Sequence, residues 1–183
     1  MPSITSEESL LLQCLSITSL LAELSNNNFL DSHYFKGLTF ANENCKIILK
    51  ESGLGNPATM QIMLYALLIV PKEILSKATY IDLEKTYLTR INQLVYSLIE
   101  KTTFSTYKNE EKIEDINYFR HIRNAVAHSK CNYFSENQKN YVIFKDNMKS
   151  MQCSIKMECW KVGLVLMELE KLIMEYYNDK HKY

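Results

Sequence analysis

Apolar residues recur at helical spacing near both ends of this chain. Close to the start they stand at Leu10, Cys14, Ile17, Leu21 and Leu24. Close to the end, steps of three and four residues connect Cys159, Val162, Leu166, Leu169, Ile173 and Tyr176. Each set falls on one side of a helix, so each predicts a helix that buries that side in a core.

Residues that form turns are scarce, because the 183 residues include only four glycines and three prolines. This shortage favours helices with short connections over a fold of many strands. A chain of this length also suits a single domain with a sizeable core. We therefore expect one all-α domain over residues 1–183, a bundle of about five to six helices.

Several helix boundaries can be predicted from the sequence. Thr5 opens the T-x-x-E pattern of a capping box, so the first helix should begin there. A second helix is expected over about residues 31–51. Asn56 and Pro57 suit the N-cap and first turn of a third helix, which should stop before Pro71.

The segment 131–156 has a different character from the rest of the chain. Its runs CNYF, YVIF and SIKM are typical of strands, and the stretches SENQKN and KDNMKS between them are typical of turns. We expect a small β-hairpin or three-stranded meander here, inserted before the last helix at about 157–177. Ahead of it, 101–110 should be a loop and about 110–127 another helix.

Overall charge and cysteine usage exclude several classes of protein. The 21 basic and 21 acidic residues cancel, so the chain as a whole is not a polycation that coats nucleic acid. Five scattered cysteines without a CxxC pair indicate neither a zinc module nor a disulfide framework, and they fit a reducing cytoplasm. The apolar run Ile62–Val70 is too short to span a bilayer. A cytoplasmic protein without a membrane segment is the expectation.

The stretch FRHIRNAVAHSK, residues 119–130, gathers two of the three arginines and two of the four histidines. On an ideal helix its core face carries Phe119, Ile122 and Val126. The opposite face carries a polar stripe made of Asn117, His121, Asn124 and His128, with Arg120 beside it. No acidic residue interrupts the stretch.

Histidine and arginine on one helix suggest chemistry at a phosphate. Histidine can take and give a proton near neutral pH, and the arginine fork binds phosphate and stabilises developing charge. Cleavage of RNA without a metal needs both functions. The same stripe is also compatible with a solvated helix face that has no function.

The run from Arg123 to His128 resembles the R-N-x-x-x-H form of the motif shared by HEPN-domain proteins, and Phe119–Ile122 is similar to the residues before that motif in bacterial members. The resemblance implies a compact helical domain that dimerises and acts as a metal-independent endoribonuclease. It implies a toxin or an anti-phage defence effector that cuts cellular RNA, with an antitoxin protein as a possible partner. Neither a metal nor another cofactor is expected.

The resemblance assigns roles within the motif. His128 would be the general base or acid, Arg123 would bind the scissile phosphate and stabilise the transition state, and Asn124 would orient His128 or a phosphate oxygen. The residues that would line the approach of the substrate are Arg120, His121 and Lys130. Lys130 stands where related toxins have a modified tyrosine, so neutralisation by tyrosine modification is not expected, whereas a phosphate contact from Lys130 is.

Helix geometry adds a constraint on the active pair. Arg123 and His128 are five residues apart, which places them about 140° apart around a regular helix. Either the helix unwinds before His128, or the long arginine side chain wraps round, or two copies of the helix meet. The third possibility predicts a twofold homodimer through the 111–128 helix. A non-catalytic HEPN-like dimer that binds nucleotide or RNA or acts as a regulatory partner, and a purely structural interaction module, remain as alternatives.

Overall fold

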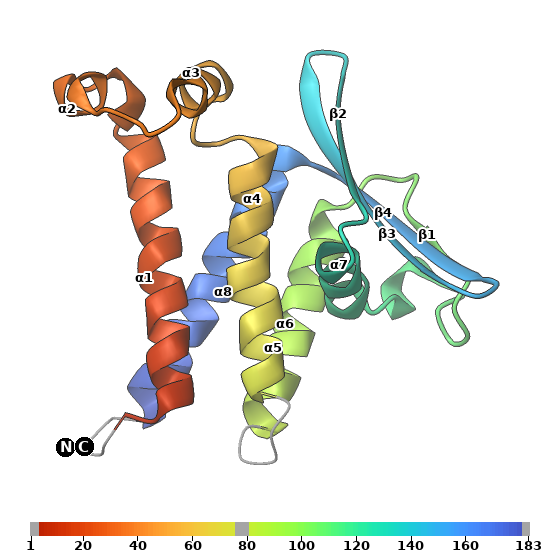
Figure 1. The fold of residues 1–183 in the computed structure, drawn as a ribbon. Coiled ribbons are helices and arrows are strands. Elements are labelled where there is room, and N and C mark those ends of the chain that lie inside the picture. The colour runs from red at the N-terminus through yellow and green to blue at the C-terminus, as the bar shows by residue number, and fades with distance from the viewer. Residues whose placement is uncertain (1–3, 76–80, 181–183) are drawn as a thin grey trace.

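The protein combines a helical bundle with an antiparallel sheet, as the computed structural model shows for residues 4–75 and 81–180 (Figure 1). The long elements of the bundle are α1 (Ser6–Asn26), α4 (Pro57–Leu64), α6 (Ile81–Leu98) and α8 (Cys159–Lys180). A shorter helix, α7 (Tyr118–Ala127), lies across the bundle and packs against the sheet. The helix that carries the polar stripe is therefore enclosed between the two layers.

The start of the bundle follows the capping signals of the sequence. The Thr5 side chain accepts a hydrogen bond from the Glu8 amide at 3.2 Å, and the Glu8 carboxylate accepts one from the Thr5 amide at 2.9 Å. Asn56 caps α4 by accepting from the Thr59 amide at 3.0 Å. Both predicted helix starts are confirmed.

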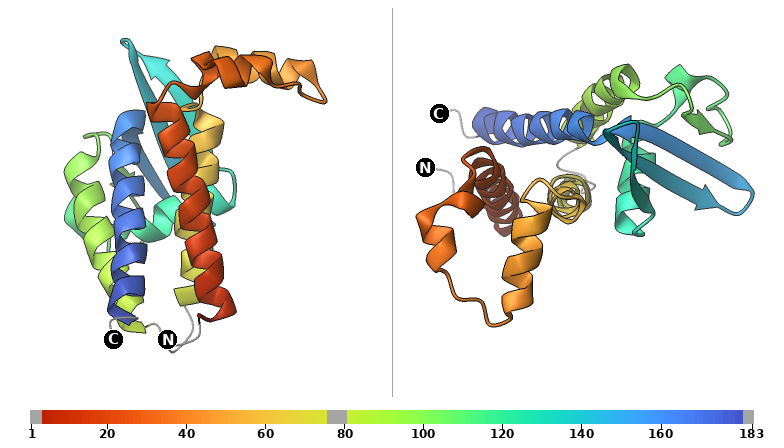
Figure 2. Two further views of the ribbon diagram at one scale, coloured as in Figure 1. Left: turned by 90° about the vertical axis from the view of Figure 1, so that its left-hand side faces the viewer. Right: turned by 90° about the horizontal axis from the view of Figure 1, so that it is seen from above.

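The single helix expected over 31–51 is wrong. The chain instead forms a 3-10 turn at Phe29–Asp31, the short helix α2 (His33–Gly37) and the helix α3 (Glu43–Ser52). The side chains of Ser32 and Asn42 each cap a helix of their own, so the two helices are separate units. Together they arch away from one end of the bundle (Figure 2).

The third helix does not stop before Pro71, because its apolar middle forms a wider helical turn. Residues Tyr65–Ile69 form a π-helix, in which the Val70 amide bonds to the Tyr65 carbonyl, and α5 (Val70–Leu75) continues through Pro71. Proline has no N–H, and its ring collides with the carbonyl four residues earlier in a regular α-helix. A wider turn directly ahead of Pro71 relieves both problems, so the helix can continue.

The sheet contains four antiparallel strands in the order β1-β4-β3-β2. They are β1 (Phe104–Ser105), β2 (Cys131–Glu136), β3 (Lys139–Met148) and β4 (Met151–Glu158). The predicted meander is confirmed as β2-β3-β4. Its first turn, Asn137 and Gln138, has φ values of 50° and 61°, which suits a tight two-residue hairpin.

The fold is mixed rather than all-α, which corrects the expected class. The helical core and the β insertion are both present, but β1 joins the sheet from the segment expected to be a loop. β3 also continues through residues expected to be a turn, to Met148. The result is a full layer that covers one side of α7.

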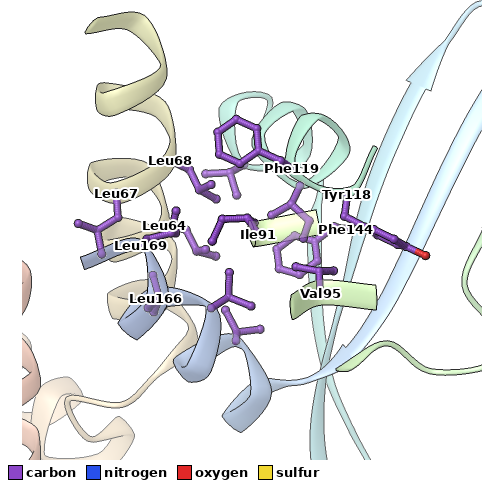
Figure 3. Close-up of a cluster of buried hydrophobic side chains, with 14 of the residues drawn as sticks. Leu64, Leu67, Leu68, Ile91, Val95, Tyr118, Phe119, Phe144, Leu166 and Leu169 are labelled. Atoms are coloured by element: carbon purple, nitrogen blue, oxygen red, sulfur yellow. The ribbon is translucent and has the colours of Figure 1, made fainter. Parts of the chain in front are cut away.

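The hydrophobic core lies where the helices and the sheet meet (Figure 3). Its most enclosed side chains come from the α4 and π-helical segment, α6, α7, α8 and the sheet, and include Leu64, Leu67, Leu68, Ile91, Val95, Tyr118, Phe144 and Leu169. Arg90 of α6 forms ion pairs with Glu168 and Glu175 of α8. These contacts hold the two helices together beside the core.

Only one of the two apolar stripes faces the core as expected. On α8, residues Val162 to Ile173 of the stripe are buried. On α1, Leu10 and Ile17 are 46% and 58% exposed, and the helix buries Leu11 and Leu15 instead. The predicted helix is present, but its buried face is rotated by about one residue.

All five cysteines are free thiols. Among the residues that the structure describes, no single helix is long and apolar enough to cross a membrane. One pair of consecutive helices, Glu43–Ser52 and Pro57–Lys72, together has the length and apolar composition of a membrane span, but the pair is bent by 92°.

Candidate functional site

Helix α7 begins at Tyr118, eight residues later than expected. The Asn117 side chain caps it by accepting a hydrogen bond from the Arg120 amide at 3.0 Å. Asn92 of α6 accepts a second bond from the Phe119 amide at 2.8 Å. The expected helical residues before it include a 3-10 turn at Ile113–Asp115. This turn lets the chain fold back, so that Glu110 points inward.

The helix ends at Ala127, and His128 is its C-cap with φ −104° and ψ 14°. The Ser129 amide bonds to the Val126 carbonyl at 3.2 Å, and the Lys130 amide bonds to the Ala125 carbonyl at 2.7 Å. This is a Schellman motif, in which Ser129 takes the left-handed position at φ 52° that glycine usually fills. His128 is therefore presented at the tip of the helix, where the chain turns into β2.

His121 lies at the centre of a buried polar cluster, with 1% of its surface exposed. Its Nδ1 is 2.7 Å from Asp146 Oδ2 of β3, and its Nε2 is 2.8 Å from Glu110 Oε2. Each ring nitrogen thus lies within hydrogen-bond distance of a carboxylate, and Nε2 is also 3.1 Å from Arg120 Nη2. We refer to Glu110, Arg120, His121 and Asp146 as the His121 cluster.

Arg120 joins the cluster from the solvent side. Its Nη2 donates to Glu110 Oε1 at 2.9 Å, and its guanidinium lies 4.9 Å from the centre of the Tyr107 ring. Ser105 of β1 donates to Glu110 Oε2 at 2.6 Å. Two carboxylates thus lie beside one guanidinium and one imidazole ring.

Asn124, one turn after His121, is held by the same strand residue. Its Nδ2 donates to Asp146 Oδ2 at 2.9 Å. The position of the Asn124 amide is therefore fixed from the sheet. Its backbone carbonyl also accepts from the His128 amide at 3.0 Å, which links the fixed amide to the end of the helix.

The surroundings of the two carboxylates favour their charged forms. Burial alone would raise the pKa of Glu110, but hydrogen bonds from Ser105 and His121 and the charge of His121 lower it below its usual value. Burial would likewise raise the pKa of Asp146, and the bonds from Asn124 and His121 with the nearby positive charges lower it. The cluster is a buried hydrogen-bond network whose two carboxylates stay charged at neutral pH.

Arg123, His128 and Lys130 have a different environment. Arg123 is half-buried, and its Nε is enclosed without a hydrogen-bond partner, while His128 and Lys130 are exposed. Within the ranges 4–75 and 81–180, no side-chain hydrogen bond or ion pair engages these three residues. Arg90 and Arg120, in contrast, both bind carboxylates.

The six candidate residues thus divide into two groups. Asn124, Arg120 and His121 are tied into the interior by Asp146 and Glu110, although the helical pattern placed His121 and Asn124 on an open face. Arg123, His128 and Lys130 are left at the C-terminal end of α7. Because the helix ends at Ala127, the C-cap residue His128 lies just beyond its last regular turn.

Sequence reasoning missed the two acidic members of the cluster. Glu110 lies where the sequence predicts the start of a helix, and Asp146 lies in the stretch KDNMKS, which the sequence predicts as a turn. The signal that could have found Asp146 is its place in the alternation of β3, where Val142, Phe144 and Asp146 are all buried. Among the residues described, no three His, Cys, Asp or Glu side chains are grouped as metal ligands.

A comparison with family models found one match, to the family described as HEPN pEK499 p136, over residues 3–180. No curated protein and no solved structure matches the chain. The match covers the helical bundle, α7 and the sheet.

Proposed function

Because this chain belongs to the HEPN pEK499 p136 family, we propose that it is a metal-independent endoribonuclease whose active pair is Arg123 and His128. The observation that carries the proposal is the state of the three arginines. Arg90 and Arg120 are bound by carboxylates, whereas the Arg123 side chain has no such partner among the described residues. Its guanidinium is available to a phosphate group, one residue before the fixed Asn124.

The reaction proposed is an attack within the RNA itself. His128 takes the proton of the 2′-hydroxyl, and the 2′-oxygen forms a bond to the adjacent phosphorus. The bond from phosphorus to the 5′-oxygen breaks, and that oxygen receives a proton from an imidazolium. The products are a 2′,3′-cyclic phosphate and a free 5′-hydroxyl. Arg123 stabilises the extra negative charge on the phosphorane.

The interior residues act by placing the active pair. We assign Asn124, Arg120 and His121 as positioning residues, because their side chains are held by Asp146 and Glu110. Lys130 would add a phosphate contact next to His128, since it is exposed at the start of β2.

A twofold dimer would supply the second imidazole that the reaction uses. One histidine cannot be base and acid in the same step, and a second copy brings another His128. Apolar side chains suited to such an interface lie next to α7: Ile62 of α4 and Tyr65 of the π-helical segment are 58% and 51% exposed. Tyr65 belongs to the π-helical segment that packs against α7, and Ile62 follows Gln61, which donates to the Val126 carbonyl of α7.

Light scattering over a range of concentrations tests the dimer. The wild type should have twice the chain mass at micromolar concentration, and Tyr65→Glu should shift it toward the monomer. Leu10→Glu, at an exposed site on α1, is the matched control and should leave the mass unchanged. A wild type that stays monomeric at all concentrations would contradict the interface.

Cleavage of a labelled RNA in the presence of EDTA tests the activity. His128→Ala and Arg123→Ala should each reduce the rate by about a hundredfold or more. His33→Ala removes an exposed histidine of α2 and should cleave like the wild type. RNA binding without cleavage by the wild type would instead favour the non-catalytic dimer.

The biological role proposed is that of a toxin or an anti-phage effector acting in the cytoplasm, where five free thiols remain reduced. Expression of the wild type in a bacterial host should arrest growth and fragment RNA, and His128→Ala should do neither. Equal toxicity of both proteins would contradict this role. An antitoxin, if one is bound, should co-purify with His128→Ala and restore growth when expressed with the wild type.

A further inference from the structure

Two hollows join beside the end of α7. The first has a volume of about 300 Å³ and is lined by Pro57, Ala58, Gln61, Ser129, Cys131 and Tyr133. The second has a volume of about 320 Å³ and extends along the hairpin past Ser135 and Asn140. They share Pro57 and Tyr133, so they form one depression between α4 and the edge strand β2, which we call the α4–β2 groove.

The groove is continuous with the proposed active pair. Ser129, on its rim, directly follows His128 in the chain. The left-handed backbone at Ser129 turns the chain from the helix tip into the wall of the groove. Gln61 donates from Nε2 to the Val126 carbonyl at 3.3 Å, which ties the opposite wall to the last turn of α7. A nucleotide whose phosphate lies at His128 therefore has the groove beside it.

The polar groups of the groove are held in fixed orientations. The Tyr133 hydroxyl donates to Gln61 Oε1 at 3.0 Å, so the Gln61 amide is fixed between Tyr133 and α7. The Gln61 side chain also hydrogen-bonds to the Cys131 thiol, and a lone pair on its oxygen remains for a ligand. Farther along, the Ser135 hydroxyl donates to Asn140 Oδ1 at 2.7 Å, and this fixes the Asn140 side chain in the same way.

The remaining walls are flat or apolar. Tyr133 contributes an aromatic ring, and Pro57 and Met60 contribute apolar surface. Burial raises the pKa of the Tyr133 hydroxyl, which therefore stays protonated as a donor. Burial also raises the pKa of Cys131 to about 11, so this thiol lines the groove as an uncharged group and is not a nucleophile.

We propose that the α4–β2 groove binds the unpaired base of the nucleotide beside the cut phosphate and so selects the sequence that is cleaved. An unpaired base stacks on an aromatic side chain, and the polar atoms along its edge form hydrogen bonds with the protein. The groove provides an aromatic ring next to amides of fixed orientation. The volume falls within the range of small-ligand sites. This inference rests on the proposed ribonuclease, and it names the part of the RNA that the site reads.

Binding measurements separate this inference from catalysis. The probes are four single-stranded oligonucleotides that differ only in the base beside the cut position, where a 2′-deoxy sugar prevents cleavage. The wild type should prefer one base by about fivefold or more in Kd, which is the size expected for one hydrogen bond to a fixed amide. Gln61→Ala and Tyr133→Leu should bind all four with similar Kd, and the milder Tyr133→Phe should lose part of the preference. His33→Ala, the control, should keep it.

Each outcome has a distinct meaning. Groove variants that fold, as judged by circular dichroism, and keep the wild-type preference would overturn the inference. A wild type that binds the four probes equally, or none of them, would overturn it too. A preference that is lost in the groove variants, in a protein that does not cut the matching all-ribose RNA, would support the groove and contradict the proposed catalysis.

Discussion

The Asp146 carboxylate of β3 lies 2.7 Å from Nδ1 of His121 on α7, and the same oxygen, Oδ2, accepts from Asn124 at 2.9 Å. One strand residue thus fixes two successive turns of the motif helix. Glu110 holds the other side of the His121 ring at 2.8 Å. The active pair proposed for this protein therefore stands on a helix whose rotation is determined from both sides.

Removing one charge of this network should be costly. We expect Asp146→Asn to lower the free energy of unfolding by about 3 kcal/mol or more, because it removes the buried carboxylate that both His121 and Asn124 contact. Urea denaturation followed by circular dichroism measures this change. Asn147→Ala, at the exposed neighbouring position of β3, should cost less than about 1 kcal/mol. A loss for Asp146→Asn as small as the control's would contradict the role of the network.

Acid should release the same stabilisation. The pKa values of Glu110 and Asp146 are lower in the folded protein than in the unfolded chain. The unfolded state therefore binds more protons, and the contribution to stability is fully present above the unfolded pKa values, near pH 4. It disappears as the pH falls through the lower folded values. The unfolding free energy of Glu110→Gln with Asp146→Asn should consequently vary less than that of the wild type between pH 5 and the acid limit of folding.

The left-handed residue after His128 offers a gain in stability. Ser129 has φ 52°, which costs a residue with a side chain about 1 kcal/mol relative to glycine. We expect Ser129→Gly to raise the melting temperature by a few degrees. The matched Ser154→Gly, in β4, should lower the melting temperature, because glycine weakens the interior of a strand. A lower melting temperature for Ser129→Gly would show that the serine side chain stabilises the turn.

Arginine at position 123 should not be replaceable by lysine. Lysine keeps the positive charge but loses the planar fork that binds two phosphate oxygens. Arg123→Lys should therefore bind RNA with nearly the wild-type Kd while its cleavage rate falls by about tenfold or more. Single-turnover cleavage next to equilibrium binding separates the two effects. Unchanged cleavage by Arg123→Lys would assign Arg123 a role as a simple charge.

Local signals in the sequence predicted local structure well. The capping box at Thr5, the cap at Asn56, the β2-β3-β4 meander and the buried stripe of α8 all follow from patterns within a few residues. In each case the groups that decide the structure are neighbours in the chain.

The predictions of buried faces were wrong where a residue distant in the sequence determines which side chains are buried. His121 and Asn124 were placed on an open face, because a helical pattern shows no carboxylate that arrives from a strand 22 to 25 residues later. On α1 the buried face includes Thr18, whose hydroxyl is satisfied by the Leu15 carbonyl at 2.9 Å. A polar residue that bonds to its own helix can be buried, and it interrupts the apolar pattern that marks a core face.

The two carboxylates of the His121 cluster have a consequence for long-range attraction. Two of the five basic side chains in FRHIRNAVAHSK, Arg120 and His121, face Glu110 and Asp146 in the interior. At this helix, an approaching polyanion would be attracted only by the basic side chains at its C-terminal end, Arg123, His128 and Lys130. A second protomer would double their number. Few counterions would be displaced, so the affinity of this protein for RNA should fall only gently as salt is added.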